Sequence, residues 1–132
     1  MSAASIAEFM RTLERVQSGA SGAVATLARL APDVWLITPV EQAPTRGENI
    51  QVPAFRDDEG RTLFPVFSTE ATFKRWGFRS LWGTLPALAV FEAVLAVPCD
   101  ALVVDPAGPN RIRLERDILM TLVNIARSDA SH

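Results

Sequence analysis

Apolar residues recur at helical spacing through residues 5–31. Serine–glycine pairs at 18–19 and 21–22 interrupt the pattern, and Pro32 ends it. Because glycine and serine weaken a helix interior, the pattern predicts two helices with a break, or one helix with a weak middle. Ser5 and Glu8 have the spacing of a capping box, which predicts that the first helix begins at Ser5. The apolar positions are Ile6, Phe9, Met10, Leu13, Val16, Val24, Leu27, Ala28 and Leu30.

Short runs of apolar or alternating residues predict strands further along the chain. Gly60 ends the acidic turn Asp57-Asp58-Glu59-Gly60, where a hairpin needs a residue that tolerates a positive φ. Pro53 and Pro65 lack an amide donor, so we expect both at edge or non-bonded positions. The predicted strands are Val34–Val40, Gln51–Arg56, Arg61–Phe67, Ala101–Val104 and Arg111–Leu114, the last two forming a second hairpin.

Three more helices complete the predicted order. Ser68 can cap the first of them, and Pro86 suits the first turn of the second. Apart from Glu92, the second is apolar all round, so we expect both of its sides to be covered, by the domain itself or by a second copy in a homodimer. The order predicts an α+β fold, with a mixed or mainly antiparallel sheet of about five strands backed by helices. The helices are Thr69–Arg75, Leu85–Ala96 and Glu115–Arg127.

Length and composition indicate one domain. The chain has 132 residues, of which 48% are hydrophobic and 21% charged. These values fit a single globular unit, with an N-terminal helical segment at 5–31 and an α+β core at 33–127. The net charge of −2 gives no general attraction to phosphate backbones, so we predict no nucleic-acid partner. Cys99 is the only cysteine, which excludes an internal disulfide.

The chain carries no pattern that predicts export or membrane insertion. Glu8, Arg11 and Glu14 break up the apolar residues of the N-terminus, whereas a signal peptide needs an uninterrupted apolar stretch. The most apolar run, 85–97, carries Glu92 and is shorter than the ~20 residues that a membrane-spanning helix needs. We therefore predict a cytoplasmic protein with no membrane partner.

Several segments in this order resemble the N-terminal domain of the SseB family, named for enhanced serine sensitivity. They cover roughly residues 30–125. The chain has Asp105 and Ser68 where the resemblance leads us to expect asparagine and threonine. The segments are Leu36–Val40, Asp58-Glu59-Gly60, Leu63–Thr69, Trp76, the helix from Leu85 to Leu95, and Ala101–Pro106 followed by Gly108.

The resemblance implies a fold but no reaction. The family has no agreed biochemical activity, and the chain stops before the second domain of longer members. Its name is sometimes linked to type III secretion, so a secretion-associated regulator is one hypothesis, resting on the name alone.

Most catalytic chemistries lack the residues they need. His132 is the only histidine and stands at the chain end, so histidine-assisted nucleophiles and zinc sites lack their ligands or bases. Cys99 enters a predicted buried strand, where a packed thiol is the expected role. Phosphate-loop and dinucleotide motifs are missing from the sequence, and we predict no cofactor.

Carboxylates leave an enzyme open as the alternative function. Asp57, Asp58 and Glu59 could bind a hard cation, or could be solvated turn residues. Asp105 could brace its own turn. A carboxylate- or metal-dependent enzyme predicts a pocket that collects Asp57, Glu70 or Asp105.

The segment 74–83 combines basic and aromatic side chains between glycines. Such a mixture suits a protein or ligand contact, and the competing interpretation is that its aromatic residues only anchor the segment to the core. The leading hypothesis is therefore a non-catalytic binding module, with an unknown protein partner or small ligand and a possible homodimer. The candidate binding residues are Lys74, Arg75, Trp76, Phe78, Arg79 and Trp82.

Overall fold

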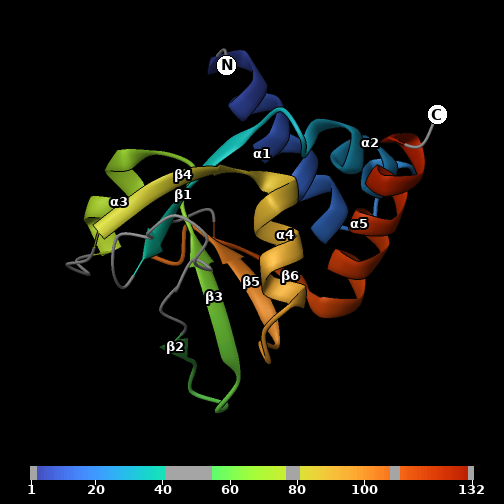
Figure 1. The fold of residues 1–132 in the computed structure, drawn as a ribbon. Helices are drawn as coiled ribbons and strands as arrows, with labels where there is room; N and C mark the ends of the chain where they lie inside the picture. The colour runs from blue at the N-terminus through green and yellow to red at the C-terminus, as the bar shows by residue number, and fades with distance from the viewer. Residues whose placement is uncertain (1–2, 41–54, 77–80, 108–110, 131–132) are drawn as a thin grey trace, which may run out of the picture.

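The computed structural model describes residues 3–40, 55–76, 81–107 and 111–130. Helices and strands fill most of these ranges (Figure 1). Within them, no helix is long and apolar enough to cross a membrane. The elements are α1 (Ala3–Gln17), α2 (Ala23–Leu30), β1 (Trp35–Val40), β2 (Phe55–Arg56), β3 (Thr62–Val66), α3 (Glu70–Trp76), β4 (Leu81–Pro86), α4 (Ala87–Leu95), β5 (Ala101–Val104), β6 (Ile112–Glu115) and α5 (Arg116–Ala130).

The described strands form two sheets. One has the order β2-β3-β5-β6, in which β3 and β5 are parallel and the other neighbours antiparallel. The other is the antiparallel ribbon β1-β4. A bridge between Ile37 and Phe67 joins them, with N···O distances of 2.9 Å in both directions. The predicted α+β class and mixed pairing are confirmed, although the strands divide into two sheets where we expected one.

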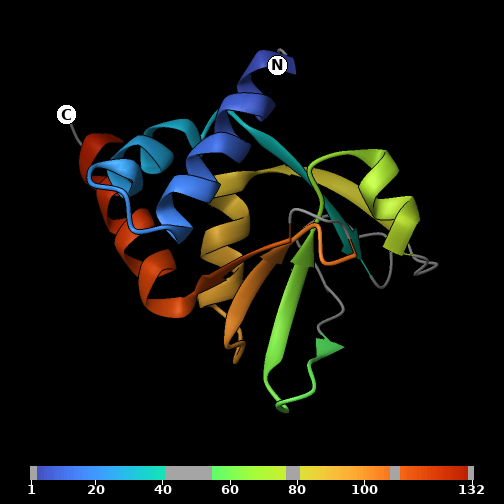
Figure 2. The same cartoon turned by 180° about the vertical axis from the view of Figure 1, so that it is seen from behind.

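One face of the four-stranded sheet is covered by helices. Phe64, Leu102 and Leu114 point into this core, which also takes side chains from α1, α2, α4 and α5. Figures 1 and 2 show α1, α2 and α5 gathered on one side of the molecule, with α4 against the sheet. The N-terminal helices therefore share one core with the sheet.

The N-terminal segment contains two helices with a break. Gly19 and Gly22 occupy the break with φ of 81° and 78°, a conformation that glycine adopts without steric cost. This selects the first of the two predicted arrangements. The prediction for the start of α1 is wrong, because the helix already begins at Ala3, and Ser5 lies inside its first turn. A capping box at Ser5 therefore does not start the helix.

The cap of α3 lies one residue later than predicted. The Thr72 amide donates to Oγ1 of Thr69 at 3.2 Å, so Thr69 caps the helix, which begins at Glu70. Ser68 instead donates to the buried side chain of Asp105. The prediction overlooked this contact because the two residues are far apart in the sequence.

Residues 81–86 form a strand where we predicted no strand and, from Leu85, the start of a helix. Leu85 precedes Pro86, and a residue before proline favours an extended backbone. Pro86 has ψ of 141° and stands before α4, which begins at Ala87. The helix predicted from Leu85 therefore begins two residues later, at Ala87. The sequence analysis also did not predict β4, the strand that pairs with β1.

The first hairpin has the predicted turn. Gly60 has φ of 80°, and its amide donates to the Asp57 carbonyl at 3.0 Å. Of the strand predicted at Gln51–Arg56, only Phe55–Arg56 is described, and Pro53 lies outside the described residues. Proline has no amide donor, and Pro65 would direct that amide to the side of β3 where β2 lies. Because β2 pairs only with Thr62 and Leu63, no described strand pairs with Pro65 on this side, and no ladder hydrogen bond is lost there.

Candidate functional site

The second face of the four-stranded sheet is not covered by the described helices. Leu63, Ala101 and Val103 point to this face, where Phe55 packs against them. They alternate along the strands with the residues that enter the main core, as the two-residue period of a strand requires. The sheet therefore presents an apolar floor on the side opposite α4.

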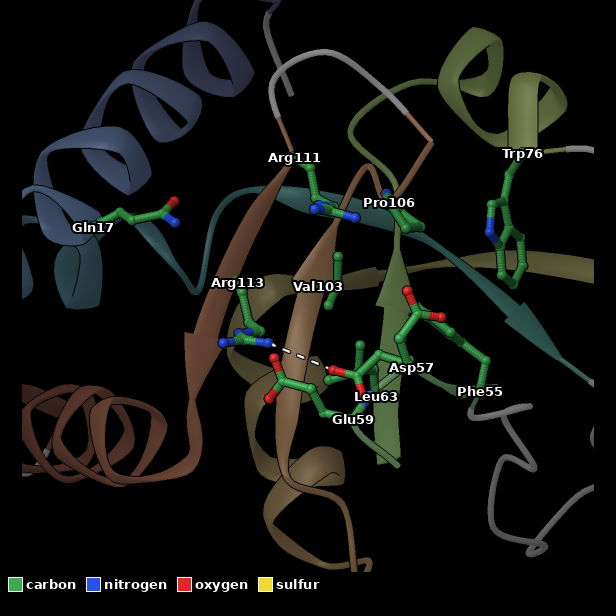
Figure 3. A pocket seen from close by; sticks show the side chains of 11 residues that line it. Gln17, Phe55, Asp57, Glu59, Leu63, Trp76, Val103, Pro106, Arg111 and Arg113 are labelled. Carbon is green, nitrogen blue, oxygen red and sulfur yellow. Dashed lines mark hydrogen bonds and ion pairs between the residues drawn. The ribbon is translucent and has the colours of Figure 1, made fainter. Parts of the chain in front are cut away.

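A pocket of about 510 Å³ lies on this floor (Figure 3). Its acidic side comes from the turn between β2 and β3, and its basic side from the start of β6. Trp76 at the end of α3 and Phe55 in β2 form an aromatic wall, with ring centroids 5.8 Å apart. The lining residues are Gln17, Phe55, Asp57, Asp58, Glu59, Leu63, Trp76, Val103, Pro106, Arg111 and Arg113.

Asp57 is held rigidly by the hairpin. Its Oδ1 accepts hydrogen bonds from the amides of Glu59 at 3.0 Å and Arg61 at 2.9 Å. Its Oδ2 lies 3.7 Å from Nη1 of Arg113, so an ion pair crosses the pocket from the turn to β6 (Figure 3). Asp57 therefore stabilises the turn. Because both of its carboxylate oxygens already have partners, Asp57 is poorly placed to bind a ligand directly.

A charge network continues along the edge of the pocket. Nε of Arg113 lies 3.1 Å from Oε1 of Glu115, and Glu115 also forms an ion pair with Arg61. The hydrogen bond to Glu115 raises the pKa of Arg61, so this guanidinium stays charged. The network therefore fixes the orientation of the Arg113 side chain over the sheet.

Arg111, Asp58 and Glu59 are exposed at the pocket rim. Among the described residues, none forms an ion pair or hydrogen bond with the side chains of these three. Sequence reasoning missed Arg111 and Arg113, although both alternate with the core residues Ile112 and Leu114. Within the described part of the chain, the pocket thus offers a guanidinium and two carboxylates whose side chains have no partner, together with an aromatic wall. This combination suits binding of a ligand with charged and apolar parts.

Of the predicted binding residues, Lys74, Arg75, Trp76 and Trp82 fall within the part of the chain that the structure describes. Trp76 packs 5.3 Å from Phe67 between ring centroids, so it anchors α3 to the core while it also lines the pocket. Lys74 and Arg75 are exposed on α3, and Lys74 pairs with Glu70 at 3.3 Å. Trp82 lies in β4 and is 44% exposed. Phe78 and Arg79 lie outside the described residues.

The carboxylates proposed for an enzyme are not brought together. Asp57 lines the pocket, whereas Asp105 is 4% exposed and Glu70 lies on α3 beside Lys74. Among the described residues, no group of three or more acidic, cysteine or histidine side chains could hold a metal ion. Cys99 is buried, and burial raises the pKa of its thiol, which lowers the thiolate fraction that a nucleophile needs.

The segments on which the sequence resemblance rests form ordered parts of the fold: β3 leading into Phe67, Trp76 at the end of α3, the apolar helix α4, and β5 running into Asp105-Pro106. The family model described as the SseB protein N-terminal domain matches residues 6–120. The chain belongs to the SseB family. The match includes most of α1 and all of α2, which precede the segments on which the resemblance rested. No curated protein and no solved structure matches the chain significantly.

The contact between Ser68 and Asp105 joins the two positions at which this SseB domain departs from the expected residues. Oγ of Ser68 donates to Oδ2 of Asp105 at 2.7 Å, and the Ser68 amide donates to Oδ1 at 2.9 Å. The two departures therefore occur within one hydrogen-bonded pair, where a change in one partner alters the site of the other.

Proposed function

We propose that this SseB domain is a non-catalytic binding module that holds a protein partner or small ligand in the pocket on the helix-free face of the sheet. The observation that carries the proposal is the combination of an aromatic wall and an apolar floor with the guanidinium of Arg111, which no described residue pairs with. The described residues that line the pocket include no serine, cysteine, lysine or histidine. Its chemistry therefore favours binding over covalent catalysis. The cytoplasmic location remains a prediction from the sequence.

The arrangement of charges favours a ligand that is acidic at one end and basic at the other. Arg111 would pair with a carboxylate or phosphate, while Asp58 and Glu59 at the opposite rim would attract a basic group. Trp76 and Phe55 would cover an apolar part between them, since aromatic rings bury a large area at a small cost in side-chain entropy. A polypeptide segment has all of these groups.

Reversal of the charge at Arg111 tests the proposal. Tagged wild-type protein and an Arg111→Glu variant are used to capture partners from a lysate of the source cells, with quantitative mass spectrometry as the readout. We expect the variant to capture about tenfold less of the specific partner than the wild-type chain does, or less still. A tenfold decrease corresponds to a loss of ~1.4 kcal/mol of binding free energy. Because Arg111 is exposed, the fold should be unchanged, and circular dichroism checks this.

The matched control is Arg29→Glu, which makes the same charge change at an exposed position on α2, away from the pocket lining. It should capture as much partner as the wild-type chain. Equal capture by all three proteins, or equal losses in both variants, would show that the pocket is not the binding surface.

A further inference from the structure

β4 has one edge that no described strand occupies. Its other edge pairs with β1 along all six residues, from Leu81 to Pro86. β4 lies in front of β1 in Figure 1 and behind it in Figure 2, so the ribbon presents β4 on the outside of the molecule. The described residues that line the pocket do not include any from β4. The edge is therefore a separate surface.

The hydrogen-bond pattern shows which groups of β4 point outward. Ile37 uses both its amide and its carbonyl to bond Phe67, so neither is directed at β4. Its pair with Thr84 is therefore non-hydrogen-bonded, and by the alternation of antiparallel ladders so is the pair of Pro39 with Trp82. Pro39 fits this position because it has no amide donor. The amides and carbonyls of Trp82 and Thr84 consequently point away from β1.

This edge carries no charge that would prevent two edges from pairing, and its one proline, Pro86, stands at the end of the strand, beyond the outward-pointing Trp82 and Thr84. No residue from Leu81 to Pro86 is charged, and proteins commonly place charges on exposed edges to block association. Gly83 stands between the two outward-pointing residues, and a Cβ built there has no atom within 4 Å. Among the described residues, none therefore obstructs the approach of a second backbone to the edge at Gly83.

We propose that a second copy of this chain binds the β4 edge as an antiparallel strand, about a twofold axis at Gly83. In this arrangement Trp82 of each copy lies opposite Thr84 of the other, and each of these two pairs exchanges two backbone hydrogen bonds. The edge is thus complementary to itself. The contact is a single short pair of strands, whereas a standard stable interface buries ~800 Å² per partner. We therefore expect a weak dimer that depends on concentration.

Sedimentation of the purified chain over a range of concentrations tests for this dimer. The average mass should rise from 14.4 kDa towards twice that value. Gly83→Glu should abolish the rise, because it places two carboxylates opposite each other across the axis, whereas Gly83→Ala should retain it. Gly83→Lys alone should also stay monomeric, but an equimolar mixture of the Glu and Lys variants should associate.

The mixture makes the test specific to this edge, because only pairing at Gly83 converts two repelling variants into an attracting pair. Amide hydrogen exchange of the wild-type chain gives a second readout that needs no variant. Exchange at Trp82 and Thr84 should slow at high concentration at least about tenfold. A mass that stays at 14.4 kDa, a dimer unaffected by Gly83→Glu, or a mixture that fails to associate would each overturn the proposal.

Discussion

Arg116→Ala is expected to lower the free energy of unfolding by about 4 kcal/mol. The Arg116 guanidinium closes the C-terminal end of α4, where the last carbonyls of a helix lack intrahelical donors. It donates to the carbonyl oxygens of Val94, Leu95, Val97 and Cys99 at 3.2, 2.6, 3.0 and 3.1 Å. The last turn of α4 has no basic residue of its own, so the truncation leaves these acceptors without their cation.

Urea unfolding at neutral pH measures this loss. Arg116→Lys should retain part of the stability, since an ammonium has the charge but lacks the planar fork that reaches several carbonyls. Arg29→Ala is the matched control, because this side chain is exposed and makes only one described hydrogen bond, of 3.5 Å, to Thr26. It should change stability by less than about 0.5 kcal/mol. A loss at Arg116 as small as this would contradict the assigned role.

Asp105→Ala is expected to destabilise the fold by about 3 kcal/mol. The side chain of Asp105 is 4% exposed and accepts both hydrogen bonds from Ser68, which ties the end of β5 to the start of α3. Its φ of 54° is also unfavourable for alanine, which lacks the local hydrogen bonding that lets aspartate adopt this conformation. The loss therefore combines two buried hydrogen bonds with backbone strain.

Two further variants separate these contributions in the same unfolding experiment. Asp105→Asn keeps an acceptor for the Ser68 amide and suits positive φ, so its stability should stay within about 1 kcal/mol of wild type. Asp105→Gly removes the hydrogen bonds but relieves the backbone, and should be less destabilising than Asp105→Ala by about 1 kcal/mol. Equal stabilities of the Gly and Ala variants would contradict the backbone strain assigned to alanine at position 105. An Ala variant as stable as wild type would contradict the stabilising role of the hydrogen bonds from Ser68.

Elements that depend on local patterns were predictable from the sequence. Gly19 and Gly22 break the N-terminal helical pattern, and Gly60 ends the acidic turn, because each position requires a backbone conformation that few residues adopt. The apolar runs of β1, β3 and β5 likewise identify buried strands before their partners are known. The α+β class followed from the order of these elements.

Features that depend on distant partners were not predictable in the same way. β4 looks like a loop with aromatic residues until it is paired with β1, and nothing in its own sequence specifies that pairing. The pocket arises because β5 pairs with β3 on one side and β6 on the other, which brings Arg113 near Asp57. The alternation of Arg111 and Arg113 with core residues was the one local signal of a charged second face.

A nuclear magnetic resonance titration tests the central claim most directly. Isotope-labelled wild-type chain is mixed with the partner obtained by capture, and the shift of each backbone amide and tryptophan indole is followed. Binding on the helix-free face predicts the largest shifts at Val103, Arg111, Arg113 and the indole of Trp76. Largest shifts at Met120 and its neighbours on the α4–α5 side, with the pocket residues unchanged, would contradict it.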